Sequence, residues 1–141
     1  IYIIVLIVTL FYGCSSSDEQ SPSNQLLLGK WYYKGTKINN NPIVLYQHQC
    51  STLKSYRDFL QNGTVSDVVY DDNCSIFQDD VVTTWTRNNS ILTFTDFLPE
   101  IQLTLTYVFE IASLTDQEMQ LKQTVVNSDS TIVYIHYYTR I

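Results

Sequence analysis

The sequence is poor in glycine and in basic residues, and both shortages exclude classes of function. Only four of the 141 residues are glycine, and no Gly-rich loop that could cradle a phosphate occurs. Neither a Gly-x-Ser-x-Gly elbow nor a His-Glu-x-x-His metal motif is present. Eight basic residues stand against 14 acidic ones without forming a cluster, which makes nucleic acid and anionic headgroups poor partners. We therefore expect neither an enzyme nor a nucleic-acid-binding protein.

Long apolar runs are also missing, apart from the start of the chain. The uncharged run at residues 1–12 would be roughly 18 Å long as a helix, too short for a bilayer core of about 30 Å. Its length and composition fit the apolar part of a secretory signal. The basic segment and the starting Met that should precede such a run are missing. We therefore expect the sequence to be truncated at its start.

A cysteine ends this apolar run. The motif FYGC at residues 11–14 resembles the lipobox of bacterial lipoproteins, in which a small residue precedes the cleavage point and cysteine comes first in the mature protein. The resemblance implies that residues 1–13 are a signal peptide and that Cys14 carries the lipid. The alternative is an N-terminal core strand with a chance cysteine, but the polar segment SSSDEQSPS at residues 15–23 has the composition of a tether.

The expected anchor and tether leave one domain. Acyl chains contribute about 0.8 kcal/mol per buried methylene, so several chains together hold a protein on a membrane without a spanning segment. We expect residues 14–25 to form the lipidated tether. The remaining residues, 26–141, number about 116, enough for a single domain with a real core.

The three cysteines are an odd number that lipidation of Cys14 turns into an even pair. An exported domain meets an oxidising compartment, so we predict a disulfide between Cys50 and Cys74. Closing a loop of about 24 residues would stabilise the fold by roughly 3 kcal/mol in the chain-entropy model. The alternative is a metal site at the H-x-C spacing of His48 and Cys50, which lacks the further close ligands that zinc needs. We expect no metal and no cofactor.

Short stretches rich in β-branched and aromatic residues recur along the domain, separated by turn formers and without helical periodicity. The Asn-Gly pair at 62–63 favours a tight two-residue hairpin turn. The clearest alternation, over residues 101–111, places Leu105, Tyr107 and Phe109 on one buried face. Short connections favour antiparallel neighbours. The eight predicted strands are residues 26–38, 56–60, 64–70, 78–87, 91–95, 101–111, 118–126 and 131–139.

An eight-stranded meander removes its free edges by closing on itself, so we predict an all-β fold, an eight-stranded antiparallel up-and-down β-barrel. The Gly-x-Trp motif at residues 29–31 resembles the lipocalin signature at the start of the first strand. The resemblance implies that Trp31 plugs the closed end of the barrel and that Arg140 lies over it. The geometry of a closed meander agrees, because the start of the first strand and the end of the last strand meet at one rim.

The order of several weaker motifs is similar to that in the small lipocalin-like lipoproteins of Bacteroidetes. The shared features are LLGKW at 27–31, Asn-Gly at 62–63, TWT at 84–86 and Leu-Thr at 114–115, together with the cysteines before the second strand and at Cys74. The resemblance covers nearly the whole mature domain. It implies a protein anchored by lipid in a bacterial outer membrane, facing the periplasm or the surface.

Eleven tyrosines are the compositional hint of binding. Aromatic faces suit apolar ligands and sugar rings, although tyrosine is also a common residue of half-buried sheet surfaces. The candidate ligand-binding residues are Trp85, Leu105, Tyr107, Phe109 and Tyr134. We expect the barrel to bind a small apolar molecule or to serve as a passive envelope component. The alternative is a protein-interaction module whose filled barrel docks on an outer-membrane assembly.

The other titratable side chains are expected to be solvated. His136 alternates with Tyr134 and Tyr138, and we expect it at a rim or on the outer face. Acid-base catalysis by two carboxylates needs two environments that shift their pKa values apart. The candidate aspartates all lie near predicted strand ends or turns. These aspartates are Asp67, Asp71, Asp72, Asp79 and Asp80. A calcium site at residues 71–73 lacks the spacing of a known loop.

Overall fold

The computed structural model describes residues 22–77 and 81–141. The predicted signal peptide, the predicted lipid attachment site Cys14 and most of the predicted tether lie outside the described residues, as do Asp79 and Asp80. Within the described part, no helix has the length and apolar character needed to cross a membrane.

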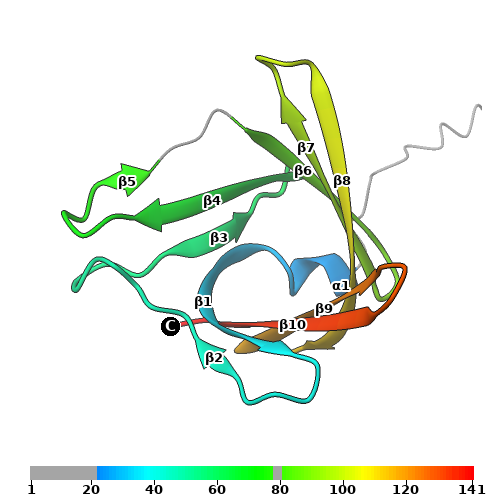
Figure 1. Cartoon of the computed structure of the whole chain (residues 1–141). Coiled ribbons are helices and arrows are strands. Elements are labelled where there is room, and N and C mark those ends of the chain that lie inside the picture. The colour runs from blue at the N-terminus through cyan, green and yellow to red at the C-terminus, as the bar shows by residue number, and fades with distance from the viewer. Residues whose placement is uncertain (1–21, 78–80) are drawn as a thin grey trace, which may run out of the picture.

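One helical turn and ten strands make up the described fold (Figure 1). They are α1 (Pro22–Gln25), β1 (Gly29–Ile38), β2 (Val44–Leu45), β3 (Tyr56–Phe59), β4 (Thr64–Tyr70), β5 (Ile76–Phe77), β6 (Val82–Asn88), β7 (Ile91–Leu98), β8 (Leu103–Leu114), β9 (Glu118–Val126) and β10 (Thr131–Thr139). Eight of the strands follow one another as antiparallel neighbours, and β1 closes the series by pairing with β10. The predicted eight-stranded barrel is confirmed, with β2 and β5 as two-residue additions at its edges.

The apolar core fills one end of the barrel. Alternate residues of each strand point inward, as the period of two requires. Trp31 of β1 and Leu92 of β7 are completely buried there, together with Leu27, which precedes β1. The other members of this core are Phe59, Val65, Trp85, Phe94, Met119, Leu121 and Tyr138. We call this end the closed end.

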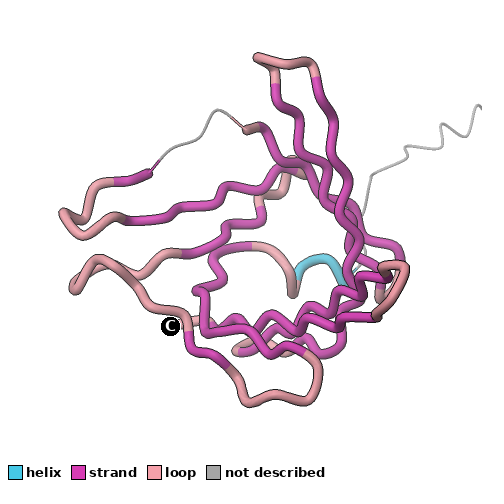
Figure 2. The backbone as a smooth tube through the Cα atoms, in the orientation of Figure 1, coloured by secondary structure: helices cyan, strands magenta, loops and turns pink. Residues whose placement is uncertain are grey.

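The barrel opens at the other end because two neighbouring strands diverge. β4 pairs with β6 only through Thr64 with Thr84 and Val65 with Thr83. Beyond these pairs, the end of β4 pairs instead with β5, and Figures 1 and 2 show β4 and β5 splayed away from β6. The β7–β8 hairpin projects beyond the other strands on the far side of this gap (Figure 1). The β4–β6 ladder is therefore limited to the part of the barrel next to the closed end.

Five of the eight barrel strands, β1, β3, β6, β7 and β8, have bounds that differ from the predicted ones. β1 starts at Gly29, because the chain before it forms α1 and a turn in which the Leu27 amide donates to the Asn24 carbonyl. The predicted two-residue turn after β3 is instead a loop of four residues, 60–63, in which the Leu60 amide donates to the Thr64 carbonyl. Its Gly63 adopts the left-handed conformation, with φ of 81°, that glycine tolerates. β8 starts at Leu103 and not in the preceding turn.

Candidate functional site

Trp31 and Arg140 meet at the closed end. The Arg140 guanidinium lies 4.2 Å from the centre of the Trp31 ring. The indole Nε1 donates to the Leu27 carbonyl at 2.8 Å, and Arg140 donates to the carbonyls of Leu26 at 2.9 Å and Leu28 at 2.6 Å. The arginine thus fixes the segment that leads into β1, and the indole, 0% exposed, fills the space beneath it. These two residues form the bottom of the barrel.

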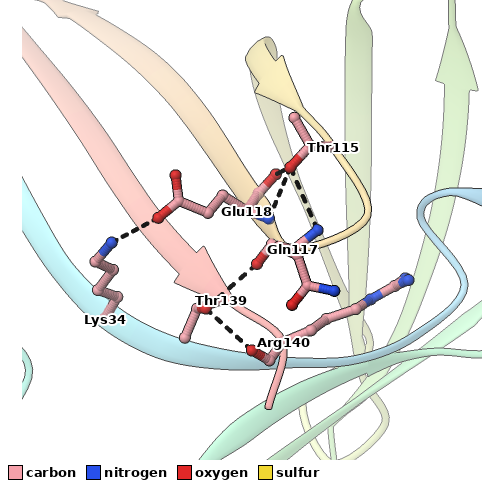
Figure 3. Close-up of polar contacts among 6 residues, drawn as sticks. All are labelled: Lys34, Thr115, Gln117, Glu118, Thr139 and Arg140. Carbon is pink, nitrogen blue, oxygen red and sulfur yellow. Dashed lines mark hydrogen bonds and ion pairs between the residues drawn. The ribbon is translucent and has the colours of Figure 1, made fainter.

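The turn between β8 and β9 holds Arg140 in place (Figure 3). The Thr115 hydroxyl oxygen accepts hydrogen bonds from the amides of Gln117 at 3.3 Å and Glu118 at 2.9 Å. The Gln117 carbonyl accepts a hydrogen bond from the Thr139 hydroxyl at 3.2 Å. It also accepts one from the Arg140 amide at 2.9 Å. A tight turn is therefore bonded directly to the end of β10, which positions the arginine side chain.

Above the closed end, the barrel interior carries an ion pair. Arg57 of β3 donates from Nε and Nη2 to the two carboxylate oxygens of Asp67 on β4, at 2.7 and 2.6 Å. The Tyr33 hydroxyl donates to the same carboxylate at 2.8 Å, and the guanidinium lies 4.7 Å from the centre of the Phe94 ring. The side chains keep 18% and 36% of their surfaces exposed, so the pair is partly desolvated. Such two-point contact gives a fixed geometry.

This environment fixes the charges of the cluster. Burial opposes the charge on Arg57, but the hydrogen bonds and the charge of Asp67 outweigh burial and raise its pKa. Burial, and then the negative charge of Asp67, raises the pKa of Tyr33. Burial also raises the pKa of Tyr138. The guanidinium therefore remains cationic and both phenols remain neutral around neutral pH.

Two hollows adjoin the ion pair. The larger has a volume of about 250 Å³, and we call it the lumen hollow. Its walls are the Arg57–Asp67 pair with Thr83, Phe94, Asp96, Tyr107 and Phe109. The second, of about 220 Å³, lies on the β1 and β10 side, next to Tyr33 and His136. Tyr33 lines this second hollow and donates a hydrogen bond to Asp67, which lines the lumen hollow.

Sequence reasoning missed Asp96 as a lining residue of the lumen hollow, as it missed Arg57, Thr83 and Phe94. Asp96 lies on β7, two positions after the inward-facing Phe94, and is half-buried. The Thr83 hydroxyl donates to its carboxylate at 2.7 Å. Among residues 22–77 and 81–141, Asp96 forms no ion pair. Strand alternation was the signal available, because an aspartate in register with buried Leu92 and Phe94 must face inward.

Of the five predicted ligand-binding residues, two line the lumen hollow and one lies in the core, while Leu105 and Tyr134 belong to neither set. Tyr107 and Phe109 line the lumen hollow, and Leu105 is the cross-strand partner of Asp96. Trp85 requires a correction, because it is 7% exposed and packs edge-on against Phe59 in the closed-end core, with ring centres 5.6 Å apart. It supports the floor of the interior and does not line the hollow.

Two side chains expected in solvent face the interior instead. The His136 ring stacks on Tyr134, with ring centres 6.3 Å apart, and meets Phe109 edge-on at 5.9 Å. It lies inside because it alternates with the buried Tyr138 and is paired with Leu121. Asp67 lies in the middle of β4 and pairs with Arg57, so it is not at a strand end, although 36% of its side chain stays exposed. Both were missed because polarity was given more weight than strand alternation.

The predicted disulfide is present between Cys50 and Cys74, whose Cα atoms are 4.8 Å apart. It joins the segment before β3 to the turn after β4. Because the Cys50 sulfur is part of this bridge, it is not a thiolate ligand for the alternative metal site with His48. The Asp71 carboxylate accepts hydrogen bonds from the backbone amides of Asn73 at 3.0 Å and Ser75 at 2.8 Å, so it stabilises the turn that it begins. In the described segments, no group of three or more His, Cys, Asp or Glu side chains could hold a metal ion.

Acidification should destabilise the fold through its two histidines. Burial lowers the pKa of His48, whose Nδ1 accepts the Ser55 amide at 3.0 Å while its Nε2 contacts the Tyr33 carbonyl at 3.1 Å. Burial and the charge of Arg57 lower the pKa of His136. Below the ordinary histidine pKa of about 6.5, the unfolded chain therefore binds more protons than the folded protein. The folded state keeps its full stability above this pH and loses stability as the pH falls below it.

Urea unfolding at neutral pH and at about pH 5 measures this effect. The unaltered protein should lose more stability on acidification than the double variant His48→Gln/His136→Gln, whose side chains do not titrate. Equal losses in the two proteins would contradict the assignment to histidine.

Comparisons with known proteins give neither a family model nor a curated protein that matches the chain. Among solved structures, the chain is similar to a deswapped triple mutant of bovine odorant binding protein, with 19% identity, 82% of this chain and 74% of that chain covered, and a TM-score of 0.40. It is also similar to bovine odorant binding protein complexed with its natural ligand, with 18% identity, 87% and 75% covered, and a TM-score of 0.41. The function must therefore be inferred from the chain's own geometry.

Proposed function

We propose that this protein is a binding protein, not an enzyme, and that it holds a small molecule in the lumen hollow while a lipid on Cys14 anchors it at a bacterial outer membrane. The observation that carries the binding role is the open hollow of about 250 Å³, whose walls combine aromatic rings with a fixed ion pair. Small-molecule sites combine apolar surface with a few placed polar groups, and polar groups make up a larger part of this wall than is usual.

The size and polarity of the hollow narrow the ligand class. Sites for drug-sized ligands usually have volumes of about 300 to 1,000 Å³, and neither hollow alone reaches this range. A ligand with a single ring and a short chain is therefore the better fit. A wholly apolar ligand would also remove water from Asp96 without replacing it, which is costly. The expected apolar ligand is thus narrowed to a small molecule with a polar end.

The position of the N-terminal segment supports the anchored arrangement. The chain enters β1 through Leu26 and Leu28, whose carbonyls bind Arg140 at the closed end. A tether leading from Cys14 to this segment would approach the barrel from its closed end. The lumen hollow, which lies above the closed end, would then face away from the tether.

A docking function is the second candidate, and exposed apolar side chains favour it. Val44 and Leu45 of β2 are 69% and 58% exposed, and Ile38 at the end of β1 is 39% exposed. β2 ends the path of paired strands, so in the described part of the chain its outer edge is unpaired. Such an edge is a ready template for another chain. A docking role would depend on this edge and not on the lumen hollow.

Three single-ring probes of different charge test the binding role: phenethyl alcohol, phenethylamine and hydrocinnamate. At least one should shift the amide NMR signals of Phe94, Tyr107 and Phe109 on titration. Thr83→Phe should abolish these shifts by filling the hollow. Thr86→Phe, on the solvent-facing side of the same strand, should leave them unchanged. No shifts with any probe, or equal shifts in the Thr83→Phe variant, would contradict the proposal.

A further inference from the structure

The lumen hollow has one negative charge that no neighbouring cation neutralises. Its charged lining residues are Arg57, Asp67 and Asp96. Arg57 and Asp67 neutralise each other through two hydrogen bonds of 2.7 and 2.6 Å. Asp96 receives only the hydroxyl of Thr83 and forms no ion pair within the described ranges. A carboxylate in a partly desolvated wall is stabilised by a cation more than by any neutral partner.

Arg57 is already committed to other partners. Its Nε and Nη2 face the two oxygens of Asp67, and its planar guanidinium lies over the Phe94 ring at 4.7 Å. Burial and the charge of Arg57 lower the pKa of His136, so this imidazole adds no positive charge near neutral pH. The hollow is therefore negatively charged, although it contains an arginine.

An accessible aromatic ring lies next to the unpaired carboxylate. In the β7–β8 ladder, Asp96 faces Leu105 and Phe94 faces Tyr107, so Tyr107 is the diagonal neighbour of Asp96 on the inward face. Tyr107 is 37% exposed, and its hydroxyl makes no hydrogen bond to the described residues. The face of an aromatic ring attracts a cation within about 6 Å. A carboxylate and an open phenol ring on one wall are complementary to an amine.

We infer that the ligand of the lumen hollow is a small organic cation, an amine whose ammonium pairs with Asp96 and whose apolar body lies against Tyr107 and Phe109. This inference rests on the proposed binding function and specifies its ligand. The ammonium donates to a carboxylate that has free acceptor sites, which an uncharged ligand would leave unfilled. A carboxylate ligand would instead face Asp96 while the arginine is held by Asp67.

The same three probes test this inference, because they differ mainly in the charge of one end. In the unaltered protein, phenethylamine should bind at least about tenfold more tightly than phenethyl alcohol, and hydrocinnamate should bind most weakly. Asp96→Asn should weaken amine binding on the order of tenfold to hundredfold, so that the preference for the amine over the alcohol is lost. The control Asp116→Asn, in the exposed turn between β8 and β9, should change neither.

The outcomes separate this inference from the function on which it rests. Equal affinities for the amine and the alcohol, or tightest binding of hydrocinnamate, would overturn the cation assignment while leaving a ligand-binding hollow. An Asp96→Asn variant that keeps its amide spectrum and still prefers the amine would also overturn it. Binding of none of the three probes would instead refute the proposed function. The comparison of probes in the unaltered protein requires no substitution, so it decides the question even if a variant fails to fold.

Discussion

Replacing Trp31 with alanine is expected to lower the free energy of unfolding by about 3 to 5 kcal/mol, the usual cost of truncating a buried large aromatic residue. The indole is 0% exposed and packs in the closed-end core. Its loss also removes the hydrogen bond to the Leu27 carbonyl and the ring beneath Arg140. Urea unfolding monitored by circular dichroism measures the change through the midpoint and the slope of the transition.

The adjacent residue provides the matched control. Tyr32 lies on the same strand as Trp31 but on the opposite face, where it contacts Tyr56 with ring centres 5.6 Å apart. Tyr32→Ala should therefore cost clearly less, about 1 kcal/mol. If Trp31→Ala unfolds at the same urea concentration as the unaltered protein, the indole does not support the closed end. Similar losses in the two variants would show that the plug is no more important than a surface ring.

The barrel was predictable because its physical requirements repeat along the chain. A strand with one buried face needs alternate apolar residues, and short turns force antiparallel neighbours. Closure then follows from the need to remove free edges, and β1 does pair with β10. The pairing of Cys50 with Cys74 followed from their even number after one cysteine is assigned to the lipid, together with an oxidising compartment.

The polar interior was not predicted, because alternation and polarity gave conflicting answers there. Arg57 shares its inward side with the buried Phe59, and Asp67 shares its own with Val65. Polar side chains normally face water. The sequence of one strand does not show which residue of the neighbouring strand is paired with a given charge. The register places Arg57 directly opposite Asp67, so the ion pair offsets the cost of removing each charge from water. The divergence of β4 from β6 depends on tertiary structure and has no local signal.

The closed and open ends of the barrel therefore have different roles. The closed end contains the apolar core and the Trp31–Arg140 contact, which stabilise the fold. The open end contains partly exposed polar groups and hollows, which contribute less to stability and are available for a ligand. Substitutions that alter the hollow, such as Asp96→Asn, should therefore affect binding more than folding.

Removing the disulfide is the other change with a large expected effect. The double variant Cys50→Ser/Cys74→Ser should lose roughly 3 kcal/mol of unfolding free energy, because a loop of about 24 residues is no longer closed in the unfolded chain. The barrel itself should persist, since neither cysteine belongs to a strand. The far-ultraviolet circular dichroism spectrum should therefore remain that of the unaltered protein, while the urea midpoint falls.

The slope of the urea transition shows where this stabilisation originates. An unfolded chain without the cross-link is more expanded and exposes more surface, so the slope should increase as the midpoint falls. Reductant should shift the unaltered protein to the midpoint of the double variant and leave the variant unchanged. Two free thiols in non-reducing mass spectrometry would refute the bridge itself. A lower midpoint with an unchanged slope would instead place the effect in the folded state, where Cys50 is buried and accepts the Leu53 amide at 3.1 Å.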